Sequence, residues 1–214
     1  MVKLNKLIKF SKDCGSQPLV FIFRYFYFKI QGKQLIADNR VIINNLRNLT
    51  TNAEVKIGID NTGFATKHDR TFLNLNGKLI FEGNFTIGKG CRFDISENGI
   101  VQVGKNGYII GFSDFIISHG LKIGDNCAIS WGCQFLDNDF HEFDYEGRKT
   151  TTNNEIVIGD NVWIGCKVSV YKGVKIANGC VIAANSVIKS SFTDENVLIA
   201  GNPAKIIKQN ISWK

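Results

Sequence analysis

The chain has 214 residues, of which 44% are apolar and 21% are charged, with 21 glycines and two prolines. This composition is typical of a folded globular protein and excludes a disordered tail or a proline-rich linker. The net charge of +7 lies in residues 1–50, which hold nine Lys and Arg against two Asp and Glu, whereas residues 51–214 hold seventeen of each. Because the larger part is neutral, no nucleic-acid-binding surface is expected.

The basic first segment is predicted to form an aromatic cap with helices near Leu4–Phe10 and Pro18–Ile30. Its apolar run Leu19–Phe23 is interrupted by Arg24, so it is too short for a membrane span and does not resemble a cleavable signal peptide. The protein is therefore expected in the cytoplasm. Residues 1–30 would either pack on the rest of the molecule or rest on an anionic membrane surface.

A six-residue repeat follows the cap. Irregular strands are expected over residues 51–86, repeats over 87–139 and 158–191, and a closing segment over 199–214. In the most regular part an aliphatic residue recurs at every sixth position: Ile158, Ile164, Val170, Ile176, Ile182 and Ile188. An α-helix does not bury every sixth residue, and a plain strand buries every second one, so the period favours a parallel β-helix.

Most of the six cysteines fit this repeat, and none forms a CxxC pair. Four occupy the small position that comes four residues after a repeat aliphatic: Cys91, Cys127, Cys133 and Cys180. Cys14 lies outside the repeat. The four are predicted to be small buried thiols without a metal or redox role, reduced as in a cytoplasmic protein.

The repeat is interrupted by a loop over residues 140–157. Counting in sixes from Phe135 places His141 where another aliphatic residue is due, and the repeat resumes at Ile158. The intervening residues are polar, and a polar loop on a rigid scaffold often carries function. His141 is therefore the leading catalytic candidate.

The segments LDNDFHEF, IGDNVWIG and AGNPAKIIK resemble the maltose/galactoside-type acetyltransferases, and more closely the O-acetyltransferases of surface-polysaccharide biosynthesis. The resemblance covers roughly residues 85–208. It implies an all-β fold, a left-handed parallel β-helix shaped as a triangular prism with 18 residues in each coil. It also implies acetyl-CoA as the donor, no metal, a sugar hydroxyl as the acceptor, and a homotrimer with sites between subunits, which would cover a flat apolar side of the prism.

The resemblance assigns roles near the loop. His141 matches the family's general base, which takes the proton of the hydroxyl as its oxygen attacks the thioester. Asp139, Glu142 or a backbone carbonyl would orient the imidazole, and the sequence leaves this choice open. Contacts to the acceptor are expected from three neighbouring residues: Asp137, Asn138 and Tyr145.

The cofactor groove is expected along the prism, because Cys166 and Ala184 lie one 18-residue coil apart and should stack on one face. In the family the matching positions hold the pantetheine arm, with basic residues near the phosphates. The expected cofactor-binding residues are Trp163, Gly165, Cys166, Ala184, Lys189, Lys205 and Lys208. The chain departs from the family in having Asn185 where a glycine is frequent and in placing Lys189 one position early.

Three alternatives compete with a sugar O-acetyltransferase. Xenobiotic acetyltransferases share the motifs and the protruding loop. A non-catalytic β-helix could serve as an assembly module. A γ-type carbonic anhydrase needs two zinc-binding histidines close in sequence, whereas His68, His119 and His141 are far apart, so this alternative is disfavoured.

Overall fold

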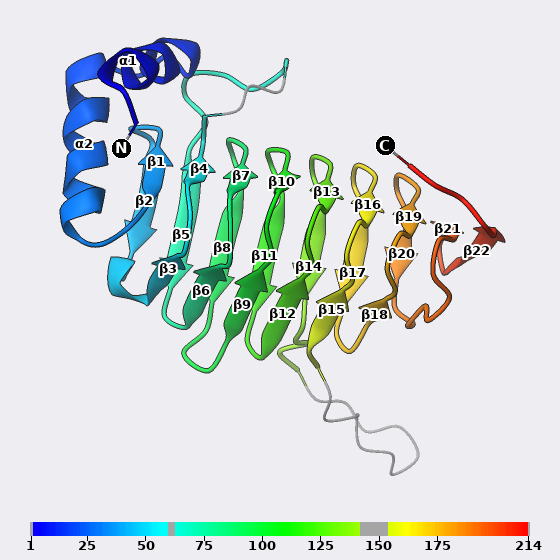
Figure 1. Cartoon of the computed structure of the whole chain (residues 1–214). Helices are drawn as coiled ribbons and strands as arrows, with labels where there is room; N and C mark the ends of the chain where they lie inside the picture. The colour runs from blue at the N-terminus through cyan, green and yellow to red at the C-terminus, as the bar shows by residue number, and fades with distance from the viewer. Residues whose placement is uncertain (1, 60–62, 142–153, 214) are drawn as a thin grey trace.

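The computed structural model describes residues 2–59, 63–141 and 154–213. The chain winds through three parallel sheets in a fixed order, so that each pass through sheets A, B and C makes one coil of a prism (Figure 1). This arrangement confirms the parallel β-helix predicted from the six-residue period. The expected aliphatics at every sixth position, Ile158 to Ile188, are all buried.

The strands of sheet A are β1 (Leu35–Ala37), β4 (Val55–Ile57), β7 (Phe85–Ile87), β10 (Gly107–Ile109), β13 (Ala128–Ile129), β16 (Trp163–Ile164), β19 (Val181–Ile182), β21 (Leu198–Gly201) and β22 (Ala204–Lys208). Those of sheet B are β2 (Val41–Asn44), β5 (Thr71–Leu75), β8 (Arg92–Ile95), β11 (Asp114–Ile117), β14 (Gln134–Leu136), β17 (Ser169–Tyr171) and β20 (Val187–Ile188). Those of sheet C are β3 (Leu49–Thr51), β6 (Lys78–Phe81), β9 (Ile100–Val103), β12 (Gly120–Ile123), β15 (Ile156–Ile158) and β18 (Lys175–Ile176).

Inward side chains of successive coils stack in register and fill the prism. Along sheet B, Phe93, Phe115 and Phe135 form a column with ring centroids 4.3 and 4.7 Å apart and planes within 6° of parallel. Four thiols at the small position, Cys91, Cys127, Cys133 and Cys180, are buried beside this core, as predicted. Replacing Phe115 by alanine would leave a large cavity and cost about 3–5 kcal/mol.

Two helices cover the first coil, α1 (Leu4–Asp13) and α2 (Pro18–Ile30). Their positions agree with the expected helices, but the coils begin earlier than expected. Strand β1 starts at Leu35 and pairs with β4, so the boundary predicted between residues 1–50 and 51–214 is wrong. The cap is the two helices alone, because β1, β2 and β3 already form a full coil.

The cap also satisfies polar groups at the open edge of the first coil. A guanidinium nitrogen of Arg24 donates a 2.8 Å hydrogen bond to the carbonyl of Val41, and the Lys33 ammonium donates to the carbonyl of Leu49. Phe28 enters the main core. Exposed strand edges promote aggregation, so these contacts explain why the prism needs a cap at this end.

A buried polar cluster fixes α1 to the prism. The Asp38 carboxylate pairs with Arg40 at 3.0 Å and with Lys89 at 3.7 Å, and both side chains also donate 2.9 Å bonds to the carbonyl of Cys14. Asp38 and Lys89 are buried, so loss of one partner would cost about 3–5 kcal/mol. Cys14, which the repeat did not explain, therefore belongs to the joint between cap and prism.

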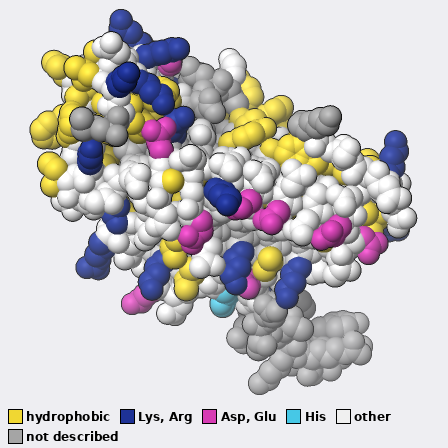
Figure 2. Space-filling view, in the orientation of Figure 1, with side chains coloured by type: hydrophobic (Ala, Val, Ile, Leu, Met, Phe, Trp, Pro, Cys, Tyr) yellow, Lys and Arg dark blue, Asp and Glu magenta, His cyan; other side chains and the backbone are white. Residues whose placement is uncertain are grey.

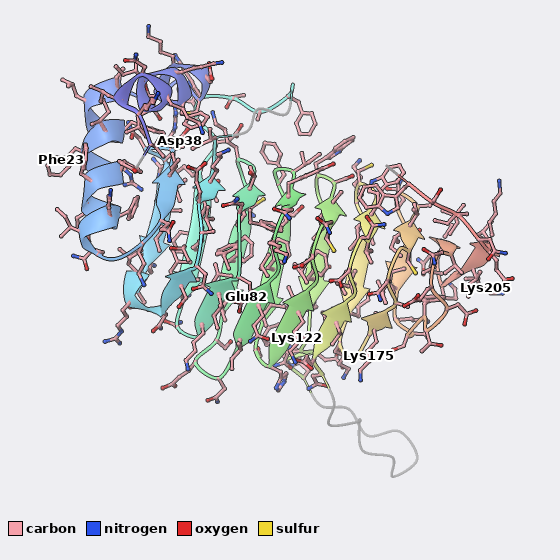
Figure 3. The ribbon with its side chains drawn as sticks, in the orientation of Figure 1. Phe23, Asp38, Glu82, Lys122, Lys175 and Lys205 are labelled. Carbon is pink, nitrogen blue, oxygen red and sulfur yellow. The ribbon has the colours of Figure 1, made fainter. Side chains whose placement is uncertain are left out.

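At the opposite end β22 folds back antiparallel to β21 and closes sheet A. Asp38 beside the cap and Lys205 on β22 mark the two ends of the prism (Figure 3). Among the described residues, none of the helices is long and apolar enough to span a membrane.

Candidate functional site

The predicted site residues lie at two different corners of the prism. We call the turns between sheets A and B the A–B corner and those between sheets B and C the B–C corner. The A–B corners form the upper edge in Figure 1, and the loop that contains His141 leaves the lower edge. The sequence placed both groups in one site without separating these edges.

At the A–B corner Cys166 and Ala184 occupy equivalent turns of adjacent coils, as the 18-residue spacing predicted. The Asn185 N–H donates a 2.9 Å bond to the Cys166 carbonyl, and the Lys167 N–H donates a 3.0 Å bond to the Trp131 carbonyl in the coil before. Lys167 and Asn185 have φ of +56° and +59°. Asparagine tolerates this left-handed conformation, so Asn185 can replace the family's glycine without altering the turn.

Some backbone N–H groups at this corner donate to carbonyls of the next coil, and others have no acceptor within the described part of the chain. Gly165 donates to the Ile182 carbonyl at 2.8 Å and Trp163 donates to the Cys180 carbonyl at 2.9 Å. Neither N–H is free to bind a ligand. Gly165 instead allows the next coil to pack closely, because a Cβ there would lie 2.7 Å from the Ala184 nitrogen. Within the described part of the chain, the N–H groups of Cys166 and Ala184 have no hydrogen-bond acceptor.

The predicted lysines of the closing motif share the outer face of sheet A. Lys205 pairs with Ala200 and Lys208 pairs with Leu198; between these pairs Ile199 faces Ile206, and a bulge takes up the one extra residue of β22. Paired residues of antiparallel strands point to the same side, so the bulge brings both ammonium groups onto the face that also carries Trp163.

Trp213, which the sequence did not single out, packs on Trp163. The ring centroids are 6.2 Å apart, and the Trp213 Nε1–H donates a 2.8 Å bond to the Asn161 carbonyl. The C-terminal segment therefore runs back over the outer face of sheet A. No periodic signal points to this contact, because it joins residues 50 positions apart across a change of direction.

An aromatic row continues the A–B corner toward the cap. Phe64 stacks on Phe112 with centroids 5.4 Å apart and lies edge-on to Trp131 at 5.8 Å. Phe64 is 55% exposed and Trp131 is 38% exposed. Phe112 has a φ of +63°, which is uncommon for a bulky residue and marks a position under backbone strain.

The B–C corner contradicts one expectation at once. Asp137 is fully buried, and its carboxylate accepts bonds of 2.7–2.8 Å from the N–H groups of Ser118, His119 and Gly120. All three donors lie in the turn of the preceding coil. Because this carboxylate is buried and bonded to the backbone of the scaffold, it is not available at the surface for an acceptor, which contradicts its expected role in substrate binding.

After Asp137 the chain comes to the surface: Asn138 is half-buried, and residues 139–141 are exposed. The Asn138 side chain accepts a 2.9 Å bond from the Phe140 N–H, and His141 ends the described part of this loop on the surface. The Asp139 carboxylate forms an ion pair with the Lys172 ammonium. That pairing occupies the group expected to orient His141. Tyr145 and Glu142 lie outside the described residues.

Lys189 also lies at the B–C corner. A hollow of about 600 Å³ is lined there by Asp139, Tyr171, Lys172, Gly173, Lys189, Ser190 and Ser191. The sequence analysis predicted that Lys189 shares a groove with Cys166 and Ala184. Within one chain this prediction is wrong, because Lys189 lies at the other corner. Assigning successive repeats to the three sheets in turn would have separated them, since Ile188, just before Lys189, belongs to sheet B whereas Ile164 and Ile182 belong to sheet A.

His119 is the second histidine at the B–C corner, one coil before His141. Its Nε2 lies 3.0 Å from the Asn154 side-chain nitrogen, and its backbone N–H is bound by Asp137. These contacts give His119 a structural role in the turn. It provides a matched comparison for His141.

The cysteines separate by exposure, and all six are free thiols. Burial raises the pKa of Cys91 to about 12 and the pKa values of Cys127 and Cys133 to about 11, and it raises the pKa of Cys180 as well. These thiols stay protonated at neutral pH. Cys166 is the partly exposed one. Among the residues that the structure describes, no group of three or more His, Cys, Asp and Glu side chains could hold a metal ion.

Comparison with known proteins gives a consistent family. The family described as bacterial transferase hexapeptide (six repeats) matches residues 155–190. An uncharacterised 24.8 kDa protein in the cps region of Klebsiella pneumoniae is 35% identical over 95% of this chain and 91% of its own length. WbbJ of Escherichia coli K12, named for O-acetyl transfer in lipopolysaccharide biosynthesis, is 31% identical over 64% of this chain and 75% of its own length.

Solved structures match the fold over most of the chain. The polysialic acid O-acetyltransferase OatWY superposes with a TM-score of 0.59 at 20% identity, covering 84% of this chain and 90% of that one. The polysialic-acid-specific acetyltransferase NeuO superposes with a TM-score of 0.55 at 22% identity, covering 85% and 89%. These likenesses confirm the left-handed β-helix expected from the sequence.

Proposed function

Because the chain belongs to the hexapeptide-repeat acetyltransferases, we propose that it transfers the acetyl group of acetyl-CoA to a sugar hydroxyl during synthesis of a surface polysaccharide in the cytoplasm. The observation that carries this proposal is the pair of corners. One offers backbone N–H groups that have no acceptor among the described residues, beside small side chains, and the other offers a polar hollow and an exposed histidine two residues after Asp139 of its lining.

The A–B corner suits the donor. An amide carbonyl of a pantetheine arm can accept a hydrogen bond from the N–H of Ala184, which lies along the prism one coil from Cys166. Lys205 and Lys208, farther along the same side, suit the phosphates of coenzyme A. Gly165 lets the backbone of the next coil approach closely, which keeps Cys166 and Ala184 in line along the prism.

The B–C corner suits the base. His141 accepts the proton of the sugar hydroxyl as its oxygen attacks the thioester carbonyl and forms a tetrahedral oxyanion. The Cys166 N–H is the donor available to that oxyanion, because those of Trp163 and Gly165 are committed. Collapse breaks the carbon–sulfur bond, and the imidazolium returns the proton to the leaving thiolate. The products are an acetyl ester and coenzyme A with a free thiol.

The two corners complete each other only between subunits. His141 and Ala184 belong to different edges of one prism, so a homotrimer would bring the B–C corner of one subunit against the A–B corner of the next. We call the row of Cys166 and Ala184 along the A–B corner the donor line. Lys189, which lies away from the donor line within one chain, would then reach the neighbour's coenzyme A.

The aromatic row of Phe64, Phe112 and Trp131 suits the acceptor. It continues the donor line beyond Cys166, and the apolar faces of sugar rings pack on exposed aromatic side chains. Asn138 and Tyr145 remain candidates for hydrogen bonds to the sugar hydroxyls.

A two-step experiment tests this function. Calorimetric titration with acetyl-CoA should give a saturable heat, and a thiol-release assay should then find turnover with free, nucleotide-linked or lipid-linked glycans. No binding of acetyl-CoA would refute the transferase function. Binding with turnover of macrolide or chloramphenicol hydroxyls, and of no glycan, would establish the xenobiotic alternative. The observation that supports this alternative is a 36% identical match to a macrolide acetyltransferase of Lysinibacillus sphaericus over 45% of this chain.

A further inference from the structure

Helix α2 has two apolar faces, and the prism buries only one of them. Phe21, Tyr25 and Phe28 are buried against α1 and the first coil. The opposite side exposes six large apolar side chains, which we call the apolar helix face: Leu19, Val20, Phe23, Phe26, Tyr27 and Ile30.

The exposure of this face is far beyond that of scattered surface residues. Leu19, Phe23 and Ile30 are 83%, 75% and 84% exposed, and they follow one another at helical spacing. At 100° per residue the six side chains span an arc of about 120°, so they form one continuous stripe. A contiguous apolar stripe of this kind marks a site of contact with a partner or a membrane.

Basic side chains border this stripe. Lys29 is exposed on α2 itself, and the neighbouring α1 segment exposes a series of lysines: Lys3, Lys6, Lys9 and Lys12. Residues 1–33 hold seven Lys and Arg and a single acidic residue, Asp13. Figure 2 shows the yellow apolar atoms over α2 and the dark blue lysines beside them at the same end of the molecule.

From this combination we propose that the apolar helix face inserts into the surface of an anionic lipid bilayer. An apolar stripe with a basic border, on a helix too short to span, lies in the plane of the interface and is held by burial of the stripe and by attraction of lysines to lipid headgroups. The cap is joined to the prism through the bonds that Lys89 and Arg40 donate to the Cys14 carbonyl at the end of α1, so the membrane would hold the whole body in a defined orientation.

The position of α2 favours a membrane over a second copy of the chain. Helix α2 covers the end of the prism, and Phe23 points away from the body there (Figure 3). In the trimer proposed above the prisms pack through their sides, so this end would stay uncovered. That step rests on the proposed function; the exposed stripe and its lysines do not.

Vesicle co-sedimentation of the full-length protein tests the proposal. With vesicles of equal parts phosphatidylglycerol and phosphatidylcholine the protein should sediment, and with phosphatidylcholine alone it should stay largely in the supernatant. Replacing Leu19, Phe23 and Ile30 together by serine should weaken binding about tenfold or more. Lys9→Gln with Lys12→Gln should weaken it by several-fold and reduce its sensitivity to salt.

Matched controls keep the test decisive. Ile100→Ser removes a 42% exposed side chain from the outer side of β9 and should leave sedimentation unchanged. The triple serine variant should keep its oligomeric state in light scattering and its thiol release with a soluble acceptor, which separates this proposal from the catalytic one. Failure of the unchanged protein to sediment with anionic vesicles would overturn the proposal. So would a triple variant that dissociates into smaller species while still sedimenting, since a second copy would then cover the stripe.

Discussion

The A–B and B–C corners are built from the same repeat and have opposite characters. The A–B turns of the late coils carry small side chains at Cys166 and Ala184, whose N–H groups have no acceptor in the part of the chain that the structure describes. The B–C turns carry charged and polar groups around a hollow lined in part by Asp139, and the exposed His141 follows Asp139 two residues along the chain. The difference teaches that the two groups of residues in the proposed reaction lie on separate edges of one chain, so the proposed trimer would be needed to bring them together.

The largest expected effect comes from removing the base. His141→Ala should lower kcat by about 10²–10⁴-fold, because the hydroxyl then loses its proton acceptor. Binding of acetyl-CoA should persist, since the A–B corner is intact. Steady-state kinetics with calorimetry measures both quantities. His119→Asn is the matched control at the same corner and should keep kcat within a few-fold, so equal losses in both variants would refute His141 as the base.

Filling the donor line should have the next largest effect. Ala184→Trp places a large ring over the N–H groups at the A–B corner and should weaken acetyl-CoA binding by about 10–100-fold. Ala53→Trp, at a half-exposed turn of the first coil, should bind as the unchanged protein does. If Ala184→Trp binds normally, the donor lies elsewhere.

A chemical probe can compare exposed and buried thiols directly. At neutral pH iodoacetamide should modify Cys166 first, because burial keeps Cys91, Cys127 and Cys133 protonated and shielded, with pKa values of about 11–12. Saturating coenzyme A should slow the modification of Cys166 several-fold. Peptide mass mapping gives the rate at each site. An unprotected Cys166 would argue against the donor line.

The smallest effect is expected at the aromatic row. Phe64→Ala should raise the KM for the acceptor by about three- to tenfold and leave the KM for acetyl-CoA unchanged, because only the sugar would pack on this ring. Phe72→Ala removes an exposed phenylalanine on the outer side of β5 and should change neither constant. Equal changes in both KM values would place Phe64 outside the acceptor site.

Much of the fold could be predicted from the sequence because burial follows a simple period in the late coils. Trp163 and its partner Val181 are 18 residues apart, so counting in sixes finds these strands. In the early coils the step is 20 residues from Leu35 to Val55 and 30 from Val55 to Phe85. Longer strands and inserted turns hide the period there, which explains why the first coil was assigned to the cap.

The candidate site was predicted in part for a related reason. Spacing alone placed Cys166 beside Ala184. It could not show that the Asp137 carboxylate is consumed by three backbone N–H groups, because a buried and an exposed aspartate look the same in a sequence. The contact of Trp213 with Trp163 was also out of reach, since it depends on the reversal of the chain after β22.

Mixed trimers test the central claim, that two subunits complete each site, most directly. His141→Ala and Ala184→Trp subunits should each have little activity alone when acetyl-CoA is well below the KM of the Ala184→Trp variant, but they should regain activity when they are unfolded and refolded together in equal amounts. Random assembly would give about a quarter of the interfaces an intact His141 corner facing an intact Ala184 corner. Recovery of about a quarter of the unchanged protein's activity is the predicted result. Mixed trimers that stay inactive would contradict the account and place the whole site within one chain.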